Sequence, residues 1–254
     1  MARVIVVTSG KGGVGKTTVT ALIGRELARN GKKVVLIDAD LGLKNLDVVL
    51  GLESRVVYDL EDVVKGRATL RQALVQDKFV PTLFLLPAWM RINATDIDEN
   101  YMNAIINNLQ NECDFILIDS PAGIEKGFFN AIRNAKEAIV VLTLDKTSLR
   151  DADKVVGLLK NNQINDIKLV VNKNSNSKTQ LTIADVKRIM DVPLIGVLKD
   201  DKEVQGLQNY GTLISSNSDL DVEIKNMTNK LLGIEDIVTK KSPLSRFIKS
   251  VFKS

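Results

Sequence analysis

Short apolar runs recur along the chain, and most of them are separated by segments with helical periodicity. The runs are nearly continuous and rich in leucine and β-branched residues, which is typical of strands buried on both faces of a sheet. They are Val4–Val7, Val34–Ile37, Leu83–Leu86, Phe115–Ile118, Ile139–Leu142, Leu169–Val171 and Leu194–Leu198. The helical segments are Lys16–Asn30, Ile97–Asn111, Ser148–Asn161 and Thr182–Met190. This alternation predicts an α/β fold with a single doubly wound, mostly parallel sheet and helices on both faces.

The composition removes several classes of chemistry from consideration. The chain has 254 residues, no histidine and one cysteine, Cys113. Without histidine there is no Ser-His-Asp or Cys-His catalytic group and no His-ligated metal site. A single cysteine forms neither a disulfide framework nor a CxxC pair, and it is typical of a reducing compartment. The remaining chemistry rests on lysine, arginine, carboxylates, hydroxyls, backbone amides and a hard cation.

Nothing in the apolar pattern predicts a transmembrane or exported protein. No apolar run approaches the roughly 18 residues that span a bilayer, and Val4–Val7 is too short for the core of a signal peptide. The 44% hydrophobic and 26% charged residues are ordinary for a globular protein. We therefore expect a cytoplasmic protein.

The positive charge is concentrated at the C-terminal end. Five basic residues and no acidic ones follow position 239: Lys240, Lys241, Arg246, Lys249 and Lys253. The rest of the chain has 30 basic and 31 acidic side chains, so it is close to neutral. The Lys-Lys-Ser-Pro sequence at 240–243 marks a boundary, which predicts a globular domain over residues 1–238 and a separate basic segment over 239–254.

A glycine-rich loop follows the first predicted strand. Residues 10–17 read Gly-Lys-Gly-Gly-Val-Gly-Lys-Thr, which satisfies the P-loop pattern GxxxxGK[ST] between a strand and a helix. Glycines let successive backbone N–H groups turn toward phosphate oxygens, and the helix N-terminus adds positive charge. We expect Lys16 to reach the β- and γ-phosphates and Thr17 to place its hydroxyl on Mg²⁺.

The same loop also fits a second motif. Gly10, Gly12 and Gly15 match the dinucleotide fingerprint GxGxxG, and Asp38 ends the second strand near the position expected for a ribose ligand. That alternative predicts an NAD-dependent oxidoreductase. The Lys-Thr pair at the start of the helix favours the P-loop, because a dinucleotide loop does not require it.

Carboxylates follow two of the buried strands. Asp38 and Asp40 end the second run, and Asp119 ends the fourth, as in a Walker B element. Ligands bind outside the carboxyl ends of strands in such sheets, so these acids are candidate site residues. Asp47 and Asp59 are predicted to be helix caps.

The loop contains a second lysine, Lys11, that is not needed to hold phosphate within one subunit. The segment Ser9-Gly10-Lys11-Gly12-Gly13-Val14-Gly15-Lys16-Thr17-Thr18 resembles the deviant Walker A motif of the MinD/ParA family of ATPases. The segments Asp38–Asp47 and Asp119–Glu125 resemble switch I and switch II of the MinD branch of that family. The resemblance covers almost the whole chain. It implies a P-loop ATPase that forms an ATP-dependent homodimer.

The resemblance implies a role for each matched residue. Lys11 reaches the phosphates of a partner subunit, as an arginine finger does, and Asp40 positions or activates the attacking water. Asp38 and Asp119 act with Thr17 on Mg²⁺, partly through water, and Asn45 orders switch I. The ATP-binding residues are Gly10, Lys11, Gly12, Gly13, Val14, Gly15, Lys16, Thr17, Thr18, Asn45 and Asn172.

Adenine recognition follows the family pattern less closely than phosphate chemistry does. The family uses an Asn or similar residue near Asn172 for the base, and here Lys173 follows it. After the seventh run the chain has Lys199-Asp200-Asp201, where its relatives usually have Pro-Glu-Asp.

The last twelve residues have the pattern of a basic amphipathic helix. Apolar residues at i, i+3, i+4, i+7 and i+8 form one face: Leu244, Phe247, Ile248, Val251 and Phe252. The basic residues Arg246, Lys249 and Lys253 lie elsewhere. This pattern favours reversible binding to an anionic membrane, with a helix docked on the core as the alternative. One copy binds weakly, and two copies on a dimer bind far better.

Resemblance and tail together predict a MinD-like ATPase. It would attach to the inner face of the cytoplasmic membrane in its ATP state, recruit a MinC-like division inhibitor, and be released by hydrolysis that a MinE-like or other activator stimulates. A ParA-like DNA-partitioning ATPase and a flagellar-number regulator are alternatives from the same superfamily. The near-neutral body and the phenylalanines of the tail argue against specific nucleic-acid binding.

Overall fold

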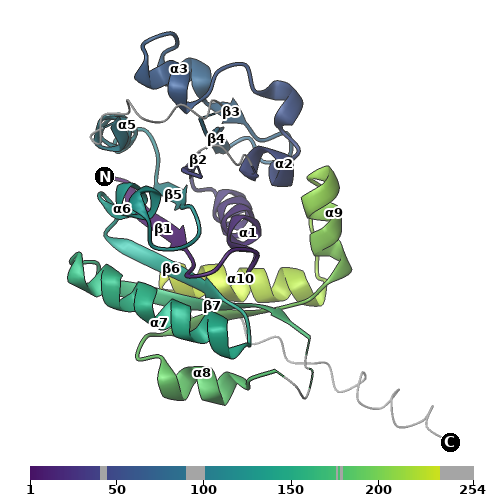
Figure 1. Ribbon diagram of the computed structural model, residues 1–254. Coiled ribbons are helices and arrows are strands. Elements are labelled where there is room, and N and C mark those ends of the chain that lie inside the picture. Colours follow the sequence, from purple (N-terminus) through teal and green to yellow (C-terminus); the bar gives the residue numbers. More distant parts are fainter. Residues whose placement is uncertain (41–44, 90–100, 176, 178–179, 235–254) are drawn as a thin grey trace, which may run out of the picture.

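The strands form one mixed sheet in the computed structural model, which describes residues 1–40, 45–89, 101–175, 177 and 180–234. Within these residues the sheet has eight strands in the order β3-β4-β2-β5-β1-β6-β7-β8 (Figure 1). The strands are β1 (Arg3–Thr8), β2 (Val34–Asp38), β3 (Val75–Gln76), β4 (Leu83–Leu86), β5 (Phe115–Asp119), β6 (Glu137–Leu142), β7 (Asp166–Asn174) and β8 (Leu194–Lys199). All neighbours pair in parallel except β3 and β4, so the predicted doubly wound fold is confirmed.

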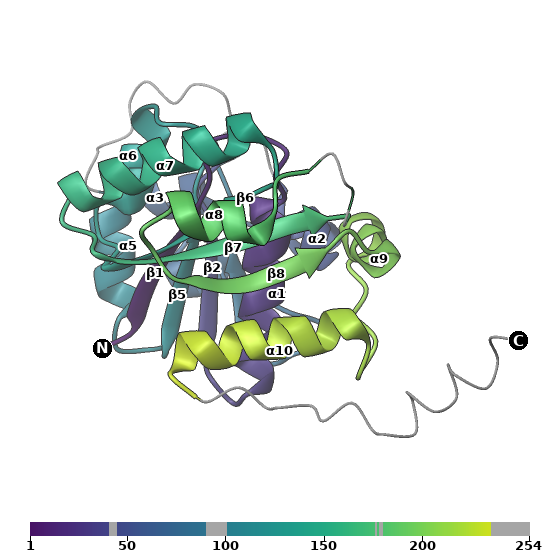
Figure 2. The same ribbon diagram turned by 90° about the horizontal axis from the view of Figure 1, so that it is seen from below.

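Helices cover both faces of this sheet (Figure 2). One face carries α1 (Lys16–Arg29), α2 (Leu46–Leu50), α9 (Lys202–Tyr210) and α10 (Asp219–Leu232). The other carries α5 (Tyr101–Leu109), α6 (Lys126–Ile132), α7 (Lys146–Asn161) and α8 (Ile183–Ile189). The short helices α3 (Leu60–Val64) and α4 (Leu70–Ala73) pack on the second face, and a 3₁₀ turn spans Glu53–Arg55. Among the described helices, none is long and apolar enough to cross a bilayer.

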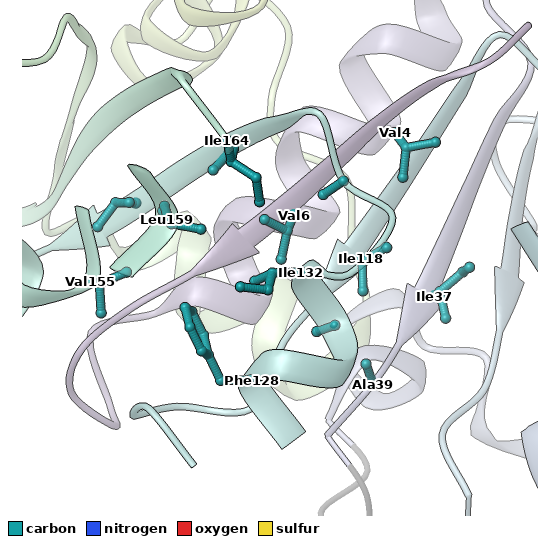
Figure 3. Close-up of a cluster of buried hydrophobic side chains, with 14 of the residues drawn as sticks. Val4, Val6, Ile37, Ala39, Ile118, Phe128, Ile132, Val155, Leu159 and Ile164 are labelled. Carbon is teal, nitrogen blue, oxygen red and sulfur yellow. The ribbon is translucent and has the colours of Figure 1, made fainter. Parts of the chain in front are cut away.

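Alternate side chains of the central strand enter two separate cores. Val4 and Val6 of β1 pack with Phe128 and Ile132 of α6 in one core (Figure 3). Ile5 and Val7 point into the other, against α1. Since both faces of β1 are buried, its residues read as one continuous apolar run, which is why the pattern identified the strand.

The predicted helices agree with the structure to within a few residues at their ends. The described part of Ile97–Asn111 forms α5, and residues 97–100 lie outside the described residues. Asp59 caps α3 by accepting from the N–H groups of Glu61 and Asp62, as predicted. The prediction for Asp47 is wrong: it lies inside the first turn of α2, and Asn45 holds the N-cap position.

The strand order reverses at β1 and places the candidate residues together. β1 lies between β5 and β6. The helix that connects β1 to β2, α1, covers one face of the sheet, and the helix that connects β5 to β6, α6, covers the other. A crevice opens at the carboxyl end of the strands where the order reverses. Asp38 of β2 stands directly beside Asp119 of β5 in the strand register, next to the loop after β1.

A buried arginine ties the P-loop helix to the neighbouring elements. Arg25 of α1 is 4% exposed, and its Nε and Nη2 donate to Asp77 Oδ2 at 3.2 and 3.0 Å. It also donates to the carbonyls of Leu50, Gly211 and Thr212, at the ends of α2 and α9. One guanidinium therefore connects α1, α2, α9 and the β3–β4 turn.

Removing this arginine is expected to leave Asp77 as an unpaired buried charge. We expect Arg25→Met to lower the free energy of unfolding by about 3–5 kcal/mol, measured by urea denaturation at pH 7. Arg188→Ala serves as the control, because Arg188 forms a surface pair with Asp185 and its side chain is 74% exposed. Equal denaturation midpoints for the two variants would contradict the structural role of Arg25.

Candidate active site

The loop after β1 has the backbone of a phosphate cradle. Gly13 and Gly15 adopt φ values of 76° and 89°, which favour glycine. Gly15 is also the N-cap of α1, so the first free N–H groups of that helix face the loop. A Cβ on Gly10 would meet the backbone of Asp151 in α7 at 2.5 Å, and one on Gly15 would meet Asn172 Nδ2 at 2.2 Å. These close approaches fix the loop between α7 and β7.

A cavity of about 500 Å³ opens over this loop. Its lining is formed by Ser9, Lys11, Gly12, Gly13, Val14, Gly15, Lys16, Thr17, Thr18, Asp40, Asn45, Val48, Val49, Ala122, Lys173 and Gln208. The volume lies in the usual range for small-ligand sites. The loop amides and lysines, together with the carboxylate of Asp40, fit a nucleotide triphosphate carried with a divalent cation.

A buried acid connects the loop to the end of β5. Asp119 Oδ1 accepts from Lys16 Nζ at 2.8 Å, and its Oδ2 accepts from Thr17 Oγ1 at 2.7 Å. Thr20 Oγ1 adds a third hydrogen bond at 3.1 Å. Both ion-pair partners are nearly inaccessible, with side chains 7% and 2% exposed. Lys16, Thr17 and Asp119, three of the predicted site residues, are therefore in direct contact.

Asp38 stands beside this group on the neighbouring strand. It is 2% exposed, and burial together with the charge of Asp119 raises its pKa to about 7. Its carboxylate accepts from the backbone N–H groups of Asp40, Asn45 and Leu46 at 3.1, 3.4 and 3.2 Å. Asp38 therefore holds both ends of the segment between β2 and α2, of which residues 41–44 lie outside the described residues.

Asp40 and Asn45 face the cavity from the two ends of that segment. Partial burial of Asp40 raises the pKa of its carboxyl, while the nearby charge of Lys16 opposes the shift. A carboxylate at this position can accept a hydrogen bond from a water held over the phosphate loop, and a raised pKa makes it a better base.

The donor set suits Mg²⁺ bound together with phosphate. Thr17 and Asp119 offer a hydroxyl and a carboxylate, and Asp38 adds a second carboxylate at the adjacent strand end. Mg²⁺ takes one or two protein oxygens, several waters and substrate phosphates in such sites. No group of three or more acidic or cysteine side chains that would hold a metal alone occurs in the part of the chain that the structure describes.

The two lysines of the loop occupy different environments. Lys16 is buried against Asp119, whereas the side chain of Lys11 is 49% exposed at the rim of the cavity. Lys11 Nζ lies 3.5 Å from Thr147 Oγ1 and 3.8 Å from Asp145 Oδ1, at the start of α7. Lys11 is therefore accessible from outside the subunit.

The residues predicted for base recognition lie differently from the phosphate residues. Asn172 is 5% exposed, and its Nδ2 donates to the carbonyl of Val14 at 2.9 Å, so it lies behind the loop. Lys173 lines the cavity instead. Lys199 turns away to Asp219 and Glu223 of α10.

The sequence analysis did not predict several residues that line the cavity, among them Lys173 and Gln208. Gln208 of α9 donates to Thr18 Oγ1 at 2.9 Å across 190 positions of the chain, and no local pattern signals that contact. Lys173 had a signal in its position, because it lies two residues after the predicted strand Leu169–Val171. The tail residues Leu244, Arg246, Phe247, Ile248, Lys249, Val251, Phe252 and Lys253 lie outside the described residues.

Comparisons with known proteins agree with this site. The family model "CobQ/CobB/MinD/ParA nucleotide binding domain" matches residues 5–214. The septum site-determining protein MinD of Synechocystis sp. is 46% identical, over 92% of this chain and 90% of that protein.

Solved structures of relatives extend the agreement to the fold. The chain from the MinC:MinD cell division protein complex of Aquifex aeolicus has a TM-score of 0.85 and 41% identity, over 92% of this chain and 97% of that chain. The septum site-determining protein MinD of Pyrococcus horikoshii, solved with Mg-ADP, has a TM-score of 0.84 and 30% identity, over 91% and 96% of the two chains. These matches do not support the alternative of an NAD-dependent oxidoreductase. The chain belongs to the MinD family of septum site-determining P-loop ATPases.

Proposed function

We propose that this protein hydrolyses ATP to ADP and phosphate and uses the cycle to control its attachment to the membrane. The observation that carries the proposal is the arrangement of two lysines on one loop. Lys16 is buried within the phosphate cradle, and Lys11 is held at its exposed rim. The Mg-ADP bound to the relative from Pyrococcus horikoshii supports a magnesium nucleotide as the ligand.

The chain's own residues supply the positioning that phosphoryl transfer requires. Amides of the loop and Lys16 bind the phosphates, while Thr17, with Asp38 and Asp119 acting in part through water, orients Mg²⁺. The bound Mg²⁺ neutralises charge that develops on the phosphate oxygens. Asp40 orients a water whose oxygen attacks the γ-phosphorus as the bond to the β–γ bridging oxygen breaks. Asn45 orders the segment that carries Asp40.

The second part of the proposal is an ATP-dependent homodimer. Lys11 leaves Asp145 and Thr147 of its own subunit and reaches the phosphates bound by the partner subunit. This exchange costs little, because the contact with Asp145 is an exposed ion pair at 3.8 Å. Each active site is then complete only when two copies meet.

The third part of the proposal concerns the membrane and the partners: the protein is cytoplasmic and attaches to the inner face of the cell membrane. When two basic amphipathic tails are joined in one dimer, binding of the first tail to an anionic surface raises the effective concentration of the second. Hydrolysis separates the two tails and so weakens the attachment. A MinC-like division inhibitor is the proposed cargo, supported by the MinC:MinD complex of the Aquifex relative. A MinE-like or other activator is the proposed stimulator of hydrolysis.

Loss of Lys11 is expected to abolish both dimerisation and activated hydrolysis. Lys11→Ala should remain a monomer with Mg²⁺ and a non-hydrolysable ATP analogue in light scattering, and its activated turnover should fall about 10³-fold, since it lacks the cation from the partner. Lys136→Ala, at an exposed lysine remote from the cavity, is the matched control. A Lys11→Ala dimer of normal affinity would contradict the role in trans.

Loss of Asp40 is expected to separate dimerisation from turnover. Asp40→Ala should form the ATP-dependent dimer, because the loop and both lysines are intact, while its turnover falls about 10²–10⁴-fold. Chemical quench of single turnovers measures the hydrolysis step. Turnover within a few fold of wild type would contradict the assignment of Asp40 to the attacking water.

The tail is tested by a charge on its apolar face. Phe247→Glu should abolish ATP-dependent sedimentation with anionic vesicles and leave nucleotide-dependent dimerisation unchanged. Ser250→Glu adds the same charge on the polar face and should weaken sedimentation much less. Sedimentation of the wild type that is equal with ADP, or a stable complex with DNA in place of vesicles, would contradict a membrane switch and favour the DNA-partitioning alternative.

A further inference from the structure

Two consecutive residues at the end of β7 hold two consecutive carbonyls of the phosphate loop. Asn172 Nδ2 donates to the carbonyl of Val14 at 2.9 Å, and Lys173 Nζ donates to the carbonyl of Gly13 at 2.7 Å. Each contact joins segments about 160 residues apart in the sequence. Two carbonyls of the loop are therefore held by an amide and by a charged ammonium from the end of β7.

The backbone at Lys173 is strained in a way that serves this contact. Lys173 has φ 55°, in the left-handed region that is unfavourable for a residue with a Cβ. The register between β7 and β8 also shifts between Val171 and Asn174, as at a β-bulge. Bulges and strained residues are concentrated at functional sites, where they redirect a side chain. Here the irregularity accompanies a lysine side chain that lies over the loop.

Because each peptide is planar, the two hydrogen bonds to the carbonyls also fix the direction of the N–H groups in the same peptides. In a planar trans peptide the C=O and N–H groups point in opposite directions. The carbonyl of Gly13 shares a peptide with the N–H of Val14, and the carbonyl of Val14 shares one with the N–H of Gly15. Fixing both carbonyls toward the end of β7 turns both N–H groups to the opposite side of the loop backbone, where anionic oxygens would accept from them.

We propose that Lys173 is a positioning residue that, with Asn172, holds the phosphate loop in its anion-binding shape. The inference rests on the proposed ATP-binding function and deepens it, because it assigns Lys173 to the phosphate end of the ligand. Its ammonium is bound to a backbone carbonyl and does not serve as a phosphate ligand. The loop is thus ordered before the ligand arrives, which lowers the entropic cost of binding.

The test compares two ligands that share phosphates and differ in the base. Binding of ATP and of inorganic tripolyphosphate, each with Mg²⁺, is measured by calorimetry for the wild type, Lys173→Met and Lys173→Arg. Lys173→Met keeps the aliphatic stem and loses the donor, so both ligands should bind about tenfold more weakly, as for a lost charged hydrogen bond. Lys173→Arg restores a cationic donor and should recover most of the affinity for both. Lys187→Met, at an exposed lysine of α8, is the matched control.

Kinetics and stability separate positioning from a folding defect. In Lys173→Met the KM for ATP should rise about tenfold while kcat stays within about threefold, since the same loop contacts serve ground state and transition state. Lys173→Asn removes the ammonium and shortens the side chain, but tolerates φ near 55°. It should melt no lower than wild type without ligand and still bind tripolyphosphate about tenfold more weakly.

Three results would overturn the inference. Weaker binding of ATP with unchanged binding of tripolyphosphate would assign Lys173 to the base, and unchanged binding of both would assign it no role. Failure of Lys173→Arg to recover affinity would show that the ammonium contact is not what matters. Wild-type protein that binds neither ligand would instead contradict the proposed function itself.

Discussion

The meeting of two carboxylates and one ammonium at the ends of neighbouring parallel strands governs this site. Asp38 and Asp119 stand side by side in the strand register, both nearly inaccessible, and Lys16 neutralises only one of them. The other carboxylate is Asp38, and its burial beside Asp119 raises its pKa to about 7. A site with this imbalance favours any ligand that brings positive charge to the strand ends. A magnesium nucleotide would meet this requirement, with its cation toward the acids and its phosphates toward the loop.

The strands and the phosphate loop could be predicted because their signals are local. β1 is buried on both faces and therefore reads as an uninterrupted apolar run, and Gly13 and Gly15 are required by backbone conformation. Asp119 was predicted from its place after such a run. The two-residue strand β3 gave no pattern, because it is held by antiparallel pairing with β4 and contributes little apolar sequence.

The rest of the site depends on contacts that no local pattern records. Asn172 stays a predicted base residue, and its Nδ2 also donates to a carbonyl 158 positions away, a contact that no local pattern signals. Gln208 contacts Thr18 across 190 positions, through a helix whose place is set by Arg25 and the close approach of Gly211 to Gly51. A sequence pattern shows which side chains a strand end presents. It does not show which of them the tertiary fold turns toward the loop and which toward the ligand.

Burial explains why one loop contains two lysines that are not interchangeable. Lys16 is enclosed with Asp119, and separating a buried ion pair leaves an unpaired charge at a cost of several kcal/mol, about 3–5 in typical cases. It therefore stays within its own subunit. Lys11 is half exposed and pairs with Asp145 in solvent, where an ion pair contributes about 1 kcal/mol or less. In the proposed dimer, a phosphate bound by the second copy would be more highly charged and less hydrated than Asp145, and so would be a stronger partner for Lys11. The difference in solvent exposure thus suits the two roles proposed for these lysines, with Lys16 binding the ligand within its own subunit and Lys11 reaching a second subunit.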